Sequence, residues 1–286
     1  MFLYKQHSKK IFLIISCAIV FVILFPSTFF STVSAKEYEG AWLEISAPKG
    51  MFVVGEELTY EVSYTVFDLG TIKFQVVDTV NRNGATVYRA KAFIDSYSIP
   101  LVNLHFVFYS EMHPEPYSFF FISHDTKNPN EKYYTKYQFN YTDNTVAYER
   151  GIQPKNIITT SGNAIIAAPQ QDGLSLFYYA RQNARQKKEM NSPIFLNEKS
   201  FNTYFNFMDK IGKQEIAAVH YPIETVEFDG RAEFTGIFGM TGGFQGFFSN
   251  DEASIPIVAK MKVLLGSIHI ELKSWKRPGW NPPKAQ

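Results

Sequence analysis

The sequence predicts a mainly β protein: a long, curved antiparallel sheet rolled into a half-barrel or barrel, with one helix near residues 172–188. Three observations predict this fold class. Apolar and polar residues alternate with a period of two, turn-forming residues separate the alternating segments, and aromatic residues make up 16% of the chain. Aromatic side chains pack well on a pleated sheet. About a dozen antiparallel strands avoid exposed edges by rolling toward closure.

The first predicted strands form a three-stranded meander with one apolar and one polar face. Over residues 55–66 the apolar face carries Leu58, Tyr60, Val62, Tyr64 and Val66. The residues between them are Glu, Thr or Ser, as expected for a strand that buries one face. Gly70 is predicted to form the turn that follows, since glycine adopts positive φ without steric cost. Two further strands are predicted at residues 72–79 and 86–94.

The rest of the chain predicts more strands, a long connection and the helix. Alternation and turn residues place strands at residues 106–112, 117–124, 132–140, 145–150, 199–208, 214–220, 225–228, 231–236, 244–250, 255–263 and 268–272. Residues 151–171 lack periodicity and are predicted to form a connection. The helix is predicted at residues 172–188, because Asp172 can cap its start and apolar residues recur at helical spacing after it.

A charged residue, Arg181, ends the apolar stripe of the predicted helix. A charge on an apolar face requires a partner, because burying it alone is costly. Asp251 is the candidate partner, and extension of the Arg181 side chain to solvent is the alternative.

The first 35 residues have the three regions of a secretory signal peptide. Lysines precede an apolar run over residues 11–25, and small residues end at Ala35. The run is shorter than the roughly 20 residues that cross a bilayer as a helix, so we expect cleavage after Ala35 and export to the periplasm or cell envelope. An uncleaved N-terminal anchor is the alternative. The predicted division is a signal peptide at 1–35, a single β-rich domain at 36–277 and a loose tail at 278–286.

Charge and cysteine content exclude two classes of function. The chain after Ala35 carries 25 Lys and Arg against 27 Asp and Glu, since the first 35 residues hold three lysines and no acid. Because the charges nearly cancel and are dispersed along the chain, the sequence predicts no nucleic-acid partner. The single cysteine, Cys17, lies inside the signal peptide. The exported part therefore has no disulfide and no thiol chemistry.

Three short segments occur in a recognisable order. They are Phe-Val-Val-Gly-Glu-Glu-Leu-Thr-Tyr at 52–60, Asp-Gly-Leu-Ser at 172–175 with Tyr178 and Arg181, and Phe-Ser-Asn-Asp at 248–251 continuing to Glu271-Leu272. Together they resemble the bacterial envelope family called domain of unknown function 3108. The chain departs from that family in two places: the family often has Trp where this chain has Phe247 or Phe248, and it is more acidic around Asn250 and Asp251. The resemblance implies an exported β-rich domain and a half-barrel similar to lipoprotein carriers. It implies no assigned activity.

No motif for catalysis or metal binding is found in the sequence. The histidines of the exported part form no metal-ligand pair at helical spacing; they are His105, His113, His124, His220 and His269. A Gly-x-Ser-x-Gly motif is missing as well. We therefore predict no catalytic residue, no metal and no cofactor. The glycine-rich segment at 239–246 opens no helix, so we interpret it as a bulge or mobile lip beside a cavity rather than a phosphate loop.

The aromatic excess has two interpretations, a thick β core or an apolar pocket. With no catalytic motif, the second interpretation predicts a binding or carrier protein for an apolar, lipid-like ligand. The predicted ligand-contacting residues are Phe74, Phe106, Phe108, Tyr117, Phe119, Gly242 and Gly243. One alternative is a structural or assembly factor whose partners are other envelope proteins. A hydrolase with a site that no motif reveals is the other.

Overall fold

The computed structural model describes residues 50–82, 84–98, 102–236, 242–262 and 266–286. All of them belong to one compact unit, Ser46–Gln286. The predictions for the signal peptide and for cleavage after Ala35 fall outside the described residues, as does the part of the glycine-rich segment at 239–241.

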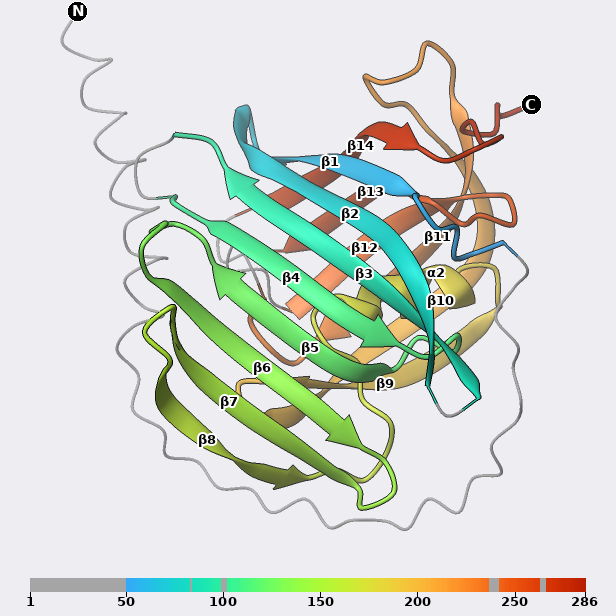
Figure 1. Ribbon diagram of the computed structural model, residues 1–286. Coiled ribbons are helices and arrows are strands. Elements are labelled where there is room, and N and C mark those ends of the chain that lie inside the picture. Colours follow the sequence, from blue (N-terminus) through green and yellow to red (C-terminus); the bar gives the residue numbers. More distant parts are fainter. Residues whose placement is uncertain (1–49, 83, 99–101, 237–241, 263–265) are drawn as a thin grey trace, which may run out of the picture. The chain divides into compact units, whose positions relative to one another are not determined.

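The described residues form one antiparallel sheet of fourteen strands and one helix, α2, at Ser175–Asn183 (Figure 1). The strands are β1 (Glu57–Tyr64), β2 (Phe67–Arg82), β3 (Ala85–Ser96), β4 (His105–Met112), β5 (Ser118–Asp125), β6 (Lys132–Asn140), β7 (Thr145–Gln153), β8 (Ile157–Ile165), β9 (Lys188–Leu196), β10 (Lys199–Gln214), β11 (Ile223–Ala232), β12 (Gly242–Ser249), β13 (Pro256–Lys262) and β14 (Ser267–Lys276). The sheet order is β8-β7-β6-β5-β4-β3-β2-β1-β14-β13-β12-β11-β10-β9. Two meanders, β1–β8 and β9–β14, are thus joined where β1 pairs with β14, and the sheet stays open. The predicted mainly β fold class is confirmed.

The alternation predicted for the first strand is confirmed, but its end is not where we predicted it. Leu58 and Val62 are fully buried on the same face of β1. Val66, predicted on that apolar face, is 86% exposed in the turn between β1 and β2. The predicted turn residue Gly70 lies inside β2 instead, where a Cβ atom would stand 2.2 Å from the backbone oxygen of Asp95. Close approach of β3, rather than a turn, explains this glycine.

Four further boundaries differ from the prediction. Residues 151–171 hold strand β8, which alternation does not reveal because both of its faces are exposed or half-exposed. The helix ends at Asn183 rather than at 188, because the chain enters strand β9 at Lys188. Residues 215–220, most of the strand predicted at 214–220, lie in a connection. The two strands predicted at 225–228 and 231–236 are replaced by the single strand β11, which ends at Ala232.

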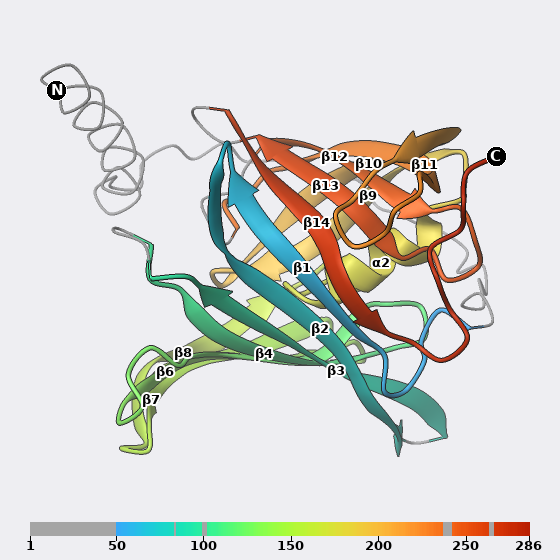
Figure 2. The ribbon, with the colours of Figure 1, turned by 90° about the horizontal axis from the view of Figure 1, so that it is seen from above.

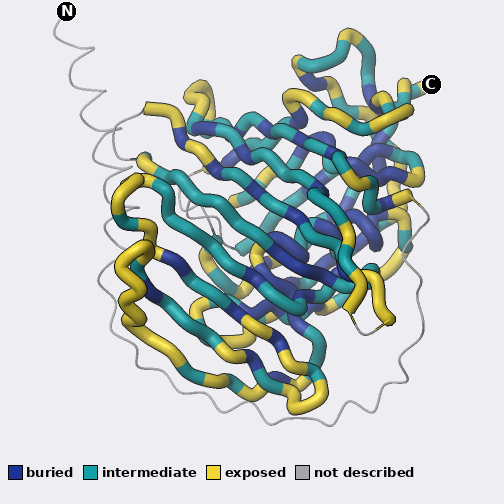
Figure 3. Tube along the Cα trace, in the orientation of Figure 1, coloured by how far each residue is buried: buried dark blue, intermediate teal, exposed yellow. Residues whose placement is uncertain are grey.

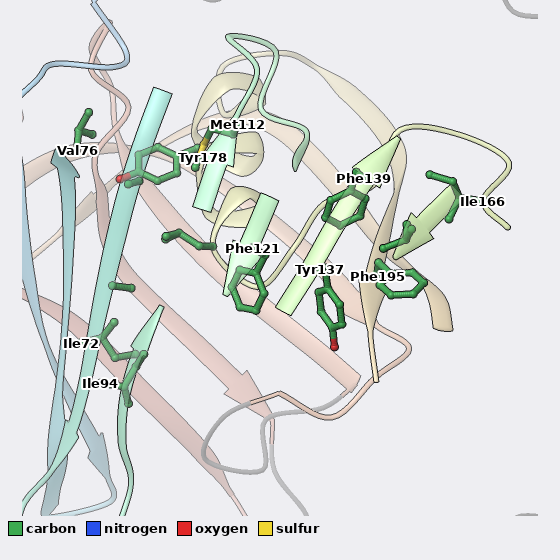
Figure 4. Packing of buried hydrophobic residues seen from close by; sticks show 14 of the residues in the cluster. Ile72, Val76, Ile94, Met112, Phe121, Tyr137, Phe139, Ile166, Tyr178 and Phe195 are labelled. Atoms are coloured by element: carbon green, nitrogen blue, oxygen red, sulfur yellow. The ribbon is translucent and has the colours of Figure 1, made fainter. Parts of the chain in front are cut away.

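The sheet curves around α2, which lies on its concave side (Figure 2). Buried residues concentrate in α2 and in the strands around it, while the loops and the β7–β8 end are more exposed (Figure 3). The largest core cluster joins the inner faces of β1–β7 to Leu174, Tyr178 and Phe195 (Figure 4). A second cluster lies around β1, β13 and β14, and a third, rich in phenylalanine, lies under β10–β12.

The two ends of the sheet are connected by side chains and by one short backbone segment. Arg150 of β7 contacts Glu198, in the turn between β9 and β10, at 2.6 Å. The Phe195 ring of β9 meets the Tyr137 ring of β6 edge-on, with centroids 5.0 Å apart. Gln171, in the connection before α2, forms a parallel bridge with Ile194 of β9. Strand β9 and the turn after it therefore contact β6, β7 and the connection before α2, although no continuous ladder of hydrogen bonds between the described strands closes the sheet.

Residues 278–286, which the sequence predicts to be a loose tail, make defined contacts. The indole N–H of Trp280 donates to Asp251 at 2.8 Å. Lys284 forms an antiparallel bridge with Ile223 at the start of β11. These contacts hold the last residues against the second meander.

Candidate functional site

The concave face carries an aromatic surface beside the helix. The rings of Phe74 in β2 and Phe177 in α2 stack with centroids 3.8 Å apart and an interplanar angle of 10°. Phe74 and Phe108 both stand opposite Ala92 of the intervening strand β3. Phe108 meets the buried Phe121 ring edge-on at 5.4 Å. Phe74, Phe108 and Phe177 pack against the core but are only partly buried, so apolar surface remains on this side of the sheet.

The seven predicted ligand-contacting residues fall in three separate places. Phe74, Phe106 and Phe108 lie on the concave face and pack against the core that contains α2. A second group stands at the connection between β4 and β5. There the Tyr117 ring stacks on His113 at 4.6 Å and meets Phe119 edge-on at 5.5 Å. Burial lowers the pKa of His113, which favours a neutral ring in this cluster.

The two predicted glycines lie in the other meander. Gly242 and Gly243 begin β12, where Gly242 has a φ of 73° and Gly243 pairs with Arg231 of β11. Residues 242–246 of the predicted lip are therefore a paired strand. A depression of about 310 Å³ lies next to this position, lined by Tyr204, Asp229, Gly230 and Arg231.

A buried ion network holds α2 at the other end of the same interior. Arg181 donates to Glu56 from Nη1 at 2.6 Å and from Nη2 at 3.2 Å. Arg277 donates to the same carboxylate. The side chains of Arg181 and Glu56 are 0% and 1% exposed, and that of Arg277 is 7% exposed. Extension of Arg181 to solvent was thus the wrong alternative.

The predicted partner of Arg181 was also wrong, because its guanidinium group pairs with the carboxylate of Glu56 rather than with that of Asp251. Asp251 contributes to this region indirectly, through the loop that contains Ala253. Its carboxylate accepts hydrogen bonds from the backbone N–H of Ala253 at 3.0 Å and from Trp280. This orders the loop whose Ala253 carbonyl accepts a hydrogen bond from Arg181 at 3.1 Å. The missed residue Glu56 lies in the first of the three resembling segments, but its separation from Arg181 by 125 residues gives no local signal.

Two tyrosines complete this buried region. Burial raises the pKa of Tyr60 and of Tyr178, so both hydroxyls stay protonated at neutral pH. Neither hydroxyl has a hydrogen-bond partner among the described residues. The region thus holds two guanidinium groups, one carboxylate and neutral phenols. Since it is closed to solvent, it can position α2 but offers no surface to a ligand.

A second buried carboxylate, Asp172, holds the start of α2. It accepts hydrogen bonds from the hydroxyls of Ser110 at 2.6 Å and Ser118 at 2.5 Å. The backbone N–H groups of Leu174 and Ser175 donate to it at 2.6 and 2.7 Å, although the N-cap residue of α2 is Leu174 rather than the predicted Asp172. Burial raises the pKa of Asp172, and these four donors oppose that rise. The sequence does not reveal the two serines, because they lie on β4 and β5, more than 50 residues away.

The described residues contain no cluster of three or more His, Cys, Asp or Glu side chains suited to a metal ion. Their one helix, α2, has nine residues and is too short to cross a membrane. Two buried polar clusters, around Glu56 and around Asp172, hold α2. The concave face carries partly buried aromatic side chains.

Comparison with known proteins places the chain in a family. No curated protein matches it. Among solved structures, a β-barrel-like protein of domain of unknown function DUF1849 from Brucella abortus is 9% identical, with a TM-score of 0.49, and covers 78% of this chain and 97% of its own. A candidate exported protein with a YmcC-like fold from Bacteroides fragilis is 8% identical, with a TM-score of 0.33, and covers 79% and 97%. The family model described as protein of unknown function (DUF3108) matches residues 59–273, and the chain belongs to this family.

Proposed function

We propose that this protein is exported to the cell envelope and binds an apolar, acyl-chain ligand on the concave face of its sheet, without catalysing a reaction. The observation that carries the proposal is the set of inner-face aromatic side chains that stay only partly buried: Phe74, Phe106 and Phe108. Covering apolar surface with a ligand gains about 25 cal/mol per Å², or about 0.8 kcal/mol per buried methylene. An acyl chain along this face would therefore bind without charged contacts.

The export part of the proposal rests on the sequence. The lysines, the apolar run over 11–25 and the small residues before Lys36 have the order that a secretory translocon and a signal peptidase recognise. A protein that works outside the cytoplasm without disulfides needs another means of stabilising its fold. The buried contacts of Arg181 and Asp172 with the sheet supply it.

The register of the sheet supports one position for the proposed ligand. Ser123 of β5 stands opposite Phe108 of β4, on the concave face, and Thr135 of β6 stands opposite Ser123. These short side chains add little side-chain volume to the inner face beside Phe108. We expect the acyl chain to lie across them, next to α2.

Binding of a fluorescent fatty acid to delipidated protein tests the proposal. Ser123→Trp fills the concave face beside Phe108 and should weaken binding at least tenfold. Ile122→Trp is the matched control, because residue 122 is the next residue of β5 and points to the opposite face. Since no ionic contact is involved, binding should change little between low and high salt. Equal affinities of both variants, or no saturable binding by the unmodified protein, would remove the proposed ligand site.

One observation favours a second candidate, a structural or assembly factor of the envelope. Ser175, Tyr178, Ala180 and Arg181 of α2 are all buried, so the helix fills much of the interior with fixed contacts. A protein whose interior is closed in this way can serve as a scaffold for envelope proteins. The same titration separates the two candidates, because a scaffold protein would be folded, lipid-free after purification and unable to bind the fluorescent fatty acid.

A further inference from the structure

The two edge strands of the open sheet differ in how they are protected. The edge of β9 is covered by the connection before α2. The Gln171 N–H donates to the Pro193 carbonyl at 2.8 Å, and the Phe195 N–H donates to the Gln171 carbonyl at 2.9 Å. Pro193 has no N–H to leave unpaired. The β9 edge therefore has little capacity to accept another strand.

The opposite edge, β8, has none of these protections. On its outer side, no strand formed by the described residues pairs with it. Its nine residues, Ile-Ile-Thr-Thr-Ser-Gly-Asn-Ala-Ile at 157–165, include no charged residue and no proline. Most of them are exposed, with Ile158 at 57% and Ile165 at 88% (Figure 3). Natural proteins usually guard such an edge with lysine, proline or a covering segment, because its unpaired backbone groups accept another strand.

We propose that β8 is a self-association surface, on which β8 of a second copy of this chain pairs antiparallel across a two-fold axis. The uncharged strand favours a second copy. In a two-fold contact, a residue at the axis lies opposite the same residue of the second copy. A charged residue there would therefore face a like charge and be repelled by it. A partner chosen by electrostatic attraction would need charges on β8, and it has none.

The pairing would be held by main-chain hydrogen bonds and by the exposed isoleucines. Nine residues of strand extend about 30 Å, and backbone bonds along such an edge supply affinity while side chains supply specificity. Ile158 lies near one end of β8 and Ile165 at the other, so an antiparallel pair covers apolar surface at both ends of the contact. A single strand pair buries less area than a permanent interface, so we expect a reversible dimer.

Sedimentation velocity on protein purified after expression of the full 286-residue chain tests this inference. The sedimentation coefficient should rise with concentration from that of a monomer to that of a dimer. Ser161 is the central residue of β8 and is exposed, so Ser161→Lys brings two like charges together at the axis. It should raise the dissociation constant about tenfold or more. Ser200→Lys, at an exposed position of β10, is the matched control and should leave the dissociation constant unchanged.

A mixing experiment distinguishes strand pairing from a change in folding. Ser161→Lys and Ser161→Glu should each dimerise poorly, and an equimolar mixture should recover a dimer, because opposite charges then meet at the axis. If the unmodified protein sediments as a monomer at every concentration, the inference is overturned. It is also overturned if the protein dimerises but Ser161→Lys weakens the dimer no more than Ser200→Lys does. Failure of the mixture to recover a dimer also overturns it.

Discussion

The contribution of the buried Glu56 carboxylate to stability can be tested with a substitution that removes its charge and keeps its size. Glu56→Gln keeps the size and shape of the side chain but removes the negative charge shared by Arg181 and Arg277. Arg181 is fully buried, and Arg277 nearly so. The substitution therefore leaves two guanidinium groups without a counter-charge, in a region where water cannot replace it.

The expected loss is large. Breaking a buried ion pair by removing one partner costs about 3–5 kcal/mol, because the remaining charge stays buried and uncompensated. A typical domain has about 5–15 kcal/mol of total stability. Glu56→Gln should thus remove about a fifth or more of it. The backbone carbonyls of Met51 and Ala253, which still accept from Arg181, reduce the loss toward the lower figure.

Urea denaturation followed by circular dichroism measures this loss. Glu61→Gln is the control, because Glu61 pairs with Lys273 at a more exposed site, with side chains 21% and 50% exposed, and such pairs contribute about 1 kcal/mol or less. Adding Arg181→Met to Glu56→Gln should recover part of the lost stability, because it removes one uncompensated charge. If Glu56→Gln and Glu61→Gln lower the urea midpoint equally, the Glu56 network is open to solvent and the reasoning fails.

Three further changes test the packing of the sheet and the start of α2, each by urea or thermal unfolding. Val62→Asp places a charge in a fully buried position and should cost more than about 4 kcal/mol, whereas Ser63→Asp on the half-exposed opposite face should cost less than about 1 kcal/mol. Gly246→Ala should cost about 1–3 kcal/mol, because the new Cβ atom would stand 2.1 Å from the Phe228 ring; no loss would show that the ring moves freely. Asp172→Ala should cost about 2 kcal/mol, since it removes the acceptor for two backbone N–H groups, and Asp172→Asn should cost less.

The fold is readable from the sequence where a strand buries one face and exposes the other. Leu58, Tyr60 and Val62 alternate with polar residues because only their side of β1 meets the core. Strand β8 has no such asymmetry, since water reaches both faces, and its residues show no period. Gly70 was predicted as a turn because a glycine that allows close strand packing and a glycine in a turn look the same in a sequence.

The site is less readable because its contacts join distant segments. Arg181 could be recognised as a charge that needs a partner, but Asp251 and Glu56 were equally plausible by type, and only the fold places Glu56 within 2.6 Å. The concave-face residues could be predicted as aromatic and inward-facing. The sequence could not separate Phe74 and Phe108, beside α2, from Tyr117, which packs on His113 elsewhere.

The three segments that resemble the family each supply a contact that holds α2. The first segment supplies Glu56, the second supplies Asp172 and Arg181, and the third supplies the Ala253 carbonyl. All four contacts fix the helix inside the sheet, and none faces the concave aromatic surface. Phe74, Phe106 and Phe108 lie outside the three segments. The three segments therefore supply contacts that hold the interior helix, whereas the partly buried aromatic residues of the concave face come from other parts of the chain.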